Sequence, residues 1–568
     1  MNDIRRTILW VIFGFSMVLL WDKWQVHNGH KATFFPSPAA VTASAPEGAA
    51  TASAPAAHAS TPAAAAAGTA QGPGGEAAAP VARERVTVTS DVLRLEFDGQ
   101  GGSLVHGELL KYPAMEDKAK PFVLFDDSAS RVYQAQTGLI GGAFPTHKTT
   151  MALVPGPREL KDGEDTLQVR FESPDLGGVK LTKTWTLKRG AYDIAVKHEV
   201  VNTGTAAVSP QLYLQLVRDG NKPAGESSFY STFTGPAVYT EAKKYQKVEF
   251  KDIKAKKFDI PSESTNGYIA MVQHYFASAW LLPDGVPRQL NMEATDIGAS
   301  TPDCCYRVQM ITPVGEIAPG QAKAVDARLF AGPQVEKTLE SLTPGLELVK
   351  DYGMFTILSK PLYWLLDKIH GVLGNWGWSI IGLVLLLKIA FYWLNAKAYA
   401  SMAKMKAINP KIMEMRERLK DKPQQMQQEM MRIYREEKVN PMGGCFPIMI
   451  QIPVFIALYW VLLSSVEIRN APWLGWIHDL SAPDPFFILP LLMTASSLLQ
   501  TALNPAPPDP MQAKMMWIMP LMFSVMFFFF PAGLVLYWLT NNILSIAQQW
   551  IINKRMGVPP QFNLPKFR

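Results

Sequence analysis

The stretch IIGLVLLLKIA, residues 380–390, carries a lysine inside an apolar run. The run covers Trp376–Leu394, and Lys388 is its one charged residue. At the centre of a membrane span, a charged side chain costs about 2.5–3.5 kcal/mol of insertion free energy. The lysine therefore needs an acidic partner or a wet cavity, and a buried charge of this kind predicts a functional site.

Four more apolar runs follow, each close to the roughly 20 residues that a helix needs to cross a bilayer. They are Cys445–Val466, Phe486–Leu503, Met515–Phe530 and Gly533–Ile552. None contains Asp or Glu, so these spans offer Lys388 no carboxylate. We therefore expect a water-filled cavity around Lys388. Polar groups that could line it include Gln451, Tyr537, Asn541 and Gln548; the alternative is that these side chains only hold helices together.

The N-terminal segment 1–24 has Arg5 and Arg6 ahead of the apolar run Ile8–Trp21. We interpret it as an uncleaved transmembrane anchor with a cytoplasmic start, with a cleaved signal peptide as the alternative. Residues 25–84 are rich in Ala and Pro and predict a disordered linker. The anchor brings the predicted number of spans to six.

Residues 85–345 have a different pattern. Apolar and polar residues alternate in LRLEF (93–97) and KLTKTWTL (180–187), and turn residues such as Asn202-Thr203-Gly204 follow such runs. Alternation with period two predicts an antiparallel β-sandwich. Its scattered histidines are expected to be structural. Residues 346–373 mix apolar and charged positions at helical spacing, which favours an interfacial amphipathic helix over a buried helix of the β domain.

Basic residues give the predicted topology. The segment 397–444 has more Lys and Arg than acids, so we expect a cytoplasmic hairpin of two helices, with breaks at Asn409-Pro410 and near Pro423. The spans are then 374–396, 445–467, 486–503, 515–530 and 533–552, with a periplasmic loop at 468–485, a cytoplasmic loop at 504–514 and a cytoplasmic tail at 553–568. The fold class is a multi-domain membrane protein: a six-span α-helical bundle with a large periplasmic antiparallel β-sandwich and a cytoplasmic hairpin.

The hairpin is rich in methionine, whose flexible side chain suits adaptable apolar recognition. Packing of the hairpin itself is the alternative. The candidate recognition residues are Met402, Met405, Met413, Met415, Met426 and Met430.

Composition sets further limits. The 568 residues are 48% hydrophobic and 18% charged, and the net charge of +6 is too small to indicate DNA binding. The three cysteines form no C-x-x-C pair, so neither a metal site nor a disulfide framework is expected, and a vicinal Cys304–Cys305 bridge would be strained. The chain has no P-loop. We expect no cofactor and no enzyme activity.

Several motifs strongly resemble the YidC family, which is related to the mitochondrial oxidase-assembly insertases. They are GNWGWSII (374–381), ASMAKM (400–405), NPKI (409–412), CFP (445–447), QIP (451–453), WIHDLS (476–481), DPMQ (509–512) and PAGLVLYW (531–538). The resemblance is dense from about residue 350 onward. The anchor and β domain resemble the version found in bacteria with two membranes.

The resemblance implies a membrane protein insertase and chaperone of the bacterial inner membrane. The even number of predicted spans and the basic residues near both ends predict cytoplasmic termini. It implies a hydrophilic groove in which Lys388 supplies the positive charge, where better-known members carry Arg. Phe455, Phe530, Tyr537 and Trp538 match expected substrate contacts. The implied partners are nascent membrane proteins, the Sec translocon, ribosome–nascent chain complexes and membrane lipid. The β domain is similar to a sugar-processing sandwich fold that is not expected to be catalytic in this family.

Two rival functions stay open on the sequence alone. A lone lysine inside the membrane could bind an anionic solute in a transporter or channel, although the chain shows no internal repeat. An envelope enzyme would need a cleft with converging carboxylates or histidines in the β domain.

Overall fold

The computed structural model describes residues 84–223, 232–295, 304–419, 422–437, 446–504, 510–557 and 562. The predicted anchor 1–24 lies outside the described residues, and so does the predicted linker 25–84 except for Glu84.

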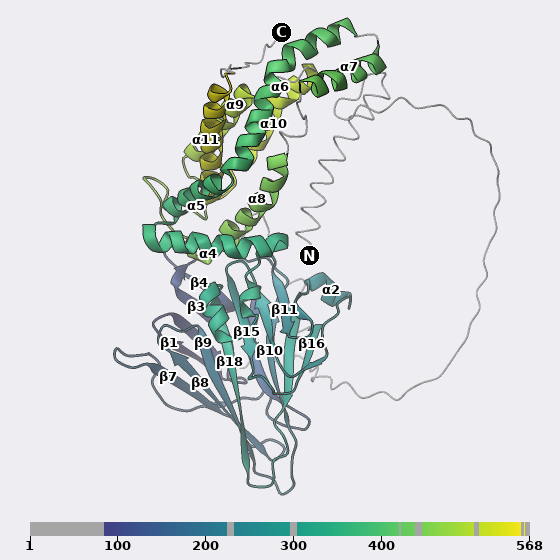
Figure 1. The fold of residues 1–568 in the computed structure, drawn as a ribbon. Coiled ribbons are helices and arrows are strands. Elements are labelled where there is room, and N and C mark those ends of the chain that lie inside the picture. The colour runs from purple at the N-terminus through teal and green to yellow at the C-terminus, as the bar shows by residue number, and fades with distance from the viewer. Residues whose placement is uncertain are drawn as a thin grey trace, which may run out of the picture. The chain divides into compact units, whose positions relative to one another are not determined.

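The β domain consists of two nine-stranded sheets in which every pairing between named strands is antiparallel (Figure 1). In spatial order, the first sheet contains β1 (Arg85–Thr89), β2 (Leu93–Asp98), β3 (Ser103–Pro113), β4 (Pro121–Asp127), β5 (Val132–Ile140), β10 (Gln211–Arg218), β17 (Tyr306–Pro313), β16 (Arg288–Ala294) and β13 (Glu263–Ser264). The second contains β12 (Lys244–Lys247), β11 (Gly235–Thr240), β14 (Tyr268–Val272), β15 (Phe276–Leu281), β18 (Ala322–Pro333), β9 (Asp193–Asn202), β8 (Val179–Lys188), β7 (Thr166–Glu172) and β6 (Ala152–Leu153). The short helices α2 (Phe250–Lys254) and α3 (Glu336–Leu342) accompany them.

Both sheets contribute to one apolar core. Trp185 of β8 is fully buried, and its ring centroid lies 5.0 Å from that of Phe97 in the first sheet and 6.0 Å from that of Trp280 in the second. Alternate residues of β8 point into this core, as the period-two pattern requires. The predicted antiparallel β domain is confirmed.

A buried lysine bridges the two sheets. The Nζ atom of Lys183 in β8 donates hydrogen bonds to the carbonyl oxygens of Gly101, at 2.6 Å, and Thr137, at 2.7 Å. Beside it, Nε2 of His198 lies 3.0 Å from Oγ1 of Thr137. No ion pair among the described residues includes Lys183, and burial lowers its pKa to about 7 and that of His198 to about 3.

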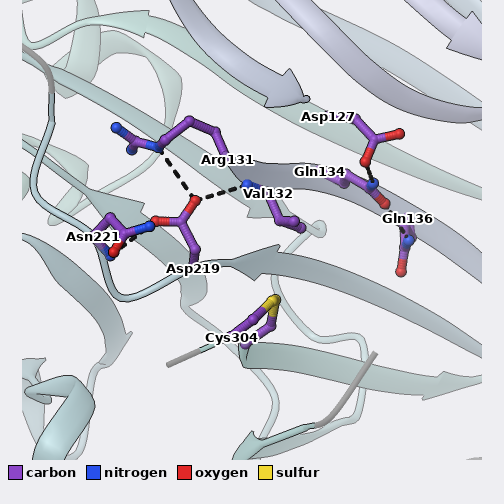
Figure 2. The surroundings of a disulfide bond; sticks show 9 residues. Asp127, Arg131, Val132, Gln134, Gln136, Asp219, Asn221 and Cys304 are labelled. Atoms are coloured by element: carbon purple, nitrogen blue, oxygen red, sulfur yellow. Dashed lines mark hydrogen bonds and ion pairs between the residues drawn. A yellow bond between two sulfur atoms is a disulfide. The ribbon is translucent and has the colours of Figure 1, made fainter. Parts of the chain in front are cut away.

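The two adjacent cysteines are joined. The structure has a Cys304–Cys305 disulfide, the vicinal bridge that the sequence left undecided (Figure 2). Nearby, the carboxylate of Asp219 accepts hydrogen bonds from the backbone N–H of Val132, at 2.7 Å, and from Nε of Arg131, at 3.3 Å.

The C-terminal part of the chain is helical (Figure 1). Its elements are η1 (Leu346–Val349), η2 (Gly353–Phe355), α4 (Thr356–Leu373), α5 (Trp376–Ala390), α6 (Tyr392–Arg418), α7 (Pro423–Glu436), α8 (Phe446–Ser464), η3 (Val466–Ile468), α9 (Ile488–Leu503), α10 (Pro510–Phe527) and α11 (Ala532–Arg555). Among the described residues, no single helix is both long and apolar enough to cross a membrane, and one pair, α5 with α6, meets the requirement only jointly across a 69° bend.

Three helix boundaries differ from the expectations. The helix expected over 346–373 begins at Thr356, because Gly353 has a φ of 67° that interrupts helical backbone. The run Trp376–Leu394 is broken at Phe391, between α5 and α6. Pro410 lies inside α6 and ends no helix, since Ile408 and Ile412 are both buried in a shared core with α7. Pro423 begins α7 as expected.

Helix α4 presents apolar residues to two sides. Leu366 is fully buried, whereas Ile357 is 89% exposed, Trp364 60% and Val372 85%. An exposed apolar face of this kind is typical of a helix that lies in a membrane interface. That placement stays a prediction.

We expect the β domain to lose stability in mild acid. Burial lowers the pKa of His198 to about 3 and that of His274 to about 4, whereas an unfolded histidine titrates near 6.5. Between those values the unfolded chain binds more protons than the folded chain, so stability is present above about pH 6.5 and is lost as the pH falls. Thermal unfolding of the full chain in detergent, followed by tryptophan fluorescence, should show a midpoint that decreases from pH 7 to pH 5.

The variant His198→Gln is the control, because the glutamine amide can donate or accept a hydrogen bond at Thr137 without titrating. Its unfolding midpoint should depend less on pH than that of the parent protein. An equally steep pH dependence of the unfolding midpoint in both proteins would contradict the contribution of His198 to the loss of stability in acid.

Candidate functional site

Lys388 lies in the last turn of α5 and contacts α11. Its Nζ atom donates a hydrogen bond to Oγ of Ser545 at 2.7 Å. The Ser545 hydroxyl in turn donates to the backbone carbonyl of Asn541, one turn earlier, at 2.7 Å. None of the ion pairs formed by described residues includes Lys388. A neutral hydroxyl therefore takes the place that a carboxylate would occupy in a buried ion pair.

A small cavity adjoins this lysine. Its volume is about 40 Å³, and it lies between α5, the start of α6, α8 and α11. A water molecule needs only about 10–15 Å³ on this measure, so the cavity can hold water beside the ammonium group. The lining residues are Val384, Leu387, Lys388, Phe391, Leu394, Asn395, Gln451, Val454, Tyr537 and Asn541.

Two amides complete the polar side of the cavity. Nε2 of Gln451 in α8 donates to Oδ1 of Asn541 in α11 at 3.0 Å, so the pair also joins the two helices. The structure thus brings together Lys388, Gln451, Tyr537 and Asn541, as proposed from the sequence.

The four predicted aromatic contacts form one cluster next to the cavity. The rings of Phe455 and Trp538 are stacked, with centroids 5.1 Å apart and planes 9° apart. Phe530 lies 5.4 Å from Trp538, and Tyr537 lies 6.0 Å from Phe455. Tyr537 and Phe530 are buried, so Phe455 and Trp538, each half-buried, are the ones more open to a ligand.

Gln548 is separate from this group. It is buried, and its Nε2 atom donates to the backbone carbonyl of Tyr392 at 3.4 Å, outside the cavity lining. Sequence reasoning missed Ser545 and Asn395, although Ser545 follows Asn541 by four residues and so shares its helical face.

A second polar row on α11 faces α9. Nδ2 of Asn542 donates to Oγ of Ser496 at 2.9 Å, and Nε2 of Gln549 donates to Oδ1 of Asn504 at 3.0 Å. These two hydrogen bonds join α11 to α9. They fit the alternative that amides hold helices together, and they lie apart from the residues that line the Lys388 cavity.

The methionines of the α6–α7 hairpin divide into two groups. Met415 is buried, and Met405, Met426 and Met430 pack around the same hairpin core. Met402 is half-buried. Met413 is 52% exposed, and Met431, a further methionine of the hairpin, is 51% exposed.

The described residues contain no group of three or more His, Cys, Asp or Glu side chains that could hold a metal ion. The cavity residues offer hydrogen bonds and one cation, with aromatic surface beside them. This arrangement can bind a polar or anionic group at the edge of an apolar helix bundle.

Comparison with known proteins gives two family matches. Residues 85–365 match the YidC periplasmic domain, and residues 368–558 match the 60Kd inner membrane protein family. The membrane protein insertase YidC of Cupriavidus metallidurans is 56% identical over 555 residues, which cover 98% of each chain, and the protein of the same name from Cupriavidus necator matches equally well.

A solved structure of an active YidC insertase, with its first transmembrane domain resolved, is 18% identical. The match covers 82% of this chain and 91% of that one, with a TM-score of 0.37. On the two family matches and the full-length relatives, the chain belongs to the YidC family of inner-membrane proteins with a periplasmic domain.

Proposed function

We propose that this protein inserts the hydrophobic segments of other proteins into the inner membrane and helps them fold and assemble there. The observation that carries the proposal is the Lys388 ammonium group, which faces a cavity large enough for water and is hydrogen-bonded to a hydroxyl instead of a carboxylate. Such a cation keeps its attraction for an incoming anion. The insertase names of the full-length relatives support the same function.

The chemistry is non-covalent. The polar or acidic flank of a nascent segment would bind near Lys388, Gln451 and Asn541, where hydrogen-bonding groups replace the water that the flank loses. The apolar part would then move past Phe455 and Trp538 into lipid. Burial of apolar surface at about 25 cal/mol per Å² supplies the free energy, so no nucleotide, cofactor or enzymatic step is required.

The proposed topology has six spans, cytoplasmic termini, a periplasmic β domain and a cytoplasmic α6–α7 hairpin. Two features support it: the excess of basic residues in 397–444, and the family match of residues 85–365 to a periplasmic domain. The predicted anchor 1–24 would be the first span. The second, 374–396, would consist of α5 and the first residues of α6, and α8, α9, α10 and α11 would be the third to the sixth.

The proposed partners are nascent membrane proteins, lipid, the Sec translocon and ribosome–nascent chain complexes. The α6–α7 hairpin is the surface that we propose to recognise the nascent hydrophobic segments. Met413 and Met431 are its exposed methionines among the described residues, and flexible apolar side chains adapt to varied sequences.

Replacing the groove lysine should impair insertion selectively. Because a hydrogen bond to a charged group contributes about 1.5–3 kcal/mol, Lys388→Ala should slow insertion of a single-span substrate with an acidic translocated segment by about tenfold or more. Lys388→Arg should retain activity. The measurement is protease protection of the substrate in proteoliposomes containing the full chain.

The control variant is Lys188→Ala, which removes an exposed lysine of β8 outside the cavity and outside the hairpin. It should insert at the parental rate. Equal rates for Lys388→Ala and the parent across several acidic substrates would rule out the cation as the attracting group.

A stalled nascent chain should crosslink to the aromatic cluster. A photoreactive amino acid at Phe455 is expected to capture the hydrophobic segment, because this ring stacks on Trp538 and lies next to Tyr537, which lines the cavity. The same probe at Ile543, 52% exposed on α11 and outside the cavity lining, should give only background. Comparable yields at both positions would place the path of the substrate elsewhere.

A further inference from the structure

A second buried lysine lies at the start of the helical part, away from the Lys388 cavity. The side chain of Lys350, between η1 and η2, has no exposed surface. Its Nζ atom lies 3.3 Å from Oε2 and 3.5 Å from Oε1 of Glu467, in η3 directly after α8. Glu467 also accepts a hydrogen bond from the hydroxyl of Tyr363 in α4, at 2.6 Å. One carboxylate therefore joins three separate segments.

Two tyrosine rings surround the same ammonium group. Lys350 Nζ lies 3.8 Å from the ring centroid of Tyr363 and 5.3 Å from that of Tyr352. The Tyr352 hydroxyl donates to a carboxylate oxygen of Glu336 in α3. We call these five residues, Glu336, Lys350, Tyr352, Tyr363 and Glu467, the Lys350 cluster.

This cluster is costly to bury and depends on its geometry. Removal of each ion from water costs several kcal/mol, and only well-placed partners offset that cost. Burial accordingly lowers the pKa of Lys350, while Glu467 and Glu336 act in the opposite direction. An apolar replacement of a buried ion pair is often as stable as the pair, so stability alone does not account for a cluster of this composition.

The surrounding contacts fix the same two helices. Oγ of Ser464, the last residue of α8, donates to the carbonyl of Asp351 at 2.6 Å, and Oγ of Ser359 in α4 donates to the carbonyl of Ala457 in α8 at 3.3 Å. A Cβ atom on Gly353 would lie 2.6 Å from Nε1 of Trp460, so the chain approaches α8 as closely as glycine allows.

The Lys350 cluster is connected to the Lys388 cavity through the packing of three helices, α4, α5 and α8. Helix α4 packs against both α5 and α8. Helix α5 carries Lys388, and α8 carries Gln451 and Phe455. The orientation of α4 against the end of α8 therefore affects both walls of the cavity.

We propose that the Lys350 cluster is a positioning device that holds α4 in one orientation against α8 and thereby sets the spacing of α5 and α8 around the Lys388 cavity. Lys350, Tyr363 and Glu467 are positioning residues, since none of them lines the cavity. The effect of the Lys350 cluster on insertion rests on the proposed function, whereas the effect of the cluster on the orientation of α4 does not.

The experiment measures the distance between spin labels on exposed positions of the two helices, Val372 in α4 and Ile452 in α8, in the full chain in nanodiscs. The parent should give one narrow distance distribution. Lys350→Met, which keeps the volume but not the charge, should broaden it, and insertion of an acidic substrate per folded molecule should fall at least about threefold. Tyr363→Phe, which removes one hydroxyl, should act in the same direction and serves if Lys350→Met does not fold.

The matched control is Lys337→Met. Lys337 also joins α3 to α4, through an ion pair to Asp367 at 2.8 Å, but its side chain is 73% exposed, and exposed pairs contribute little. It should leave both measurements at the parental values.

A narrow distribution in Lys350→Met, or in Tyr363→Phe if the lysine variant does not fold, would overturn the proposal. So would a broadened distribution with unchanged insertion, because the cluster would then not act on the cavity. If the parent itself inserts nothing, the proposed function fails, and the distance measurement still decides the positioning role.

Discussion

The central constraint on the helical part of the chain is that it holds the Lys388 ammonium group among apolar helices without a carboxylate partner. One hydrogen bond to Ser545 and a cavity of water size are its polar surroundings in the described part of the chain. A carboxylate partner would have lowered the cost of burial and would also have cancelled the field of the cation. The groups around Lys388 therefore favour an unneutralised charge over the most stable local arrangement.

Three lysines illustrate three ways of burying an amine. Lys183 is fully buried inside the β domain and donates to two backbone carbonyls. Lys350 has a carboxylate and two aromatic faces, which suit a fixed structural role. Lys388 lines the cavity between α5, α6, α8 and α11. The surroundings, not the residue type, separate a functional cation from a structural one.

The features predictable from the sequence were those with a strong period or a strong energetic cost. The alternation in β8 predicted the antiparallel domain because each strand has one buried face. The cost of a buried charge singled out Lys388 and its polar neighbours Gln451 and Asn541. Contacts between side chains of different helices could not be predicted from the sequence. The Lys388–Ser545 and Lys350–Glu467 contacts depend on how the helices rotate and pack against one another, and the sequence of one segment does not determine this. For the same reason the sequence misplaced the break at Pro410, where contacts with α7 keep α6 continuous.

The bend at Phe391 has a consequence for the α6–α7 hairpin: a small rotation there moves the far end of α6 by a much larger distance. Helix α6 has 27 residues and is therefore about 40 Å long at 1.5 Å per residue. A rotation of only about 5° at Phe391 would displace the far end of such a helix by roughly 3.5 Å. Phe391 itself lines the Lys388 cavity, so a small adjustment of that residue to an occupant would become a movement of several ångströms at the C-terminal end of α6.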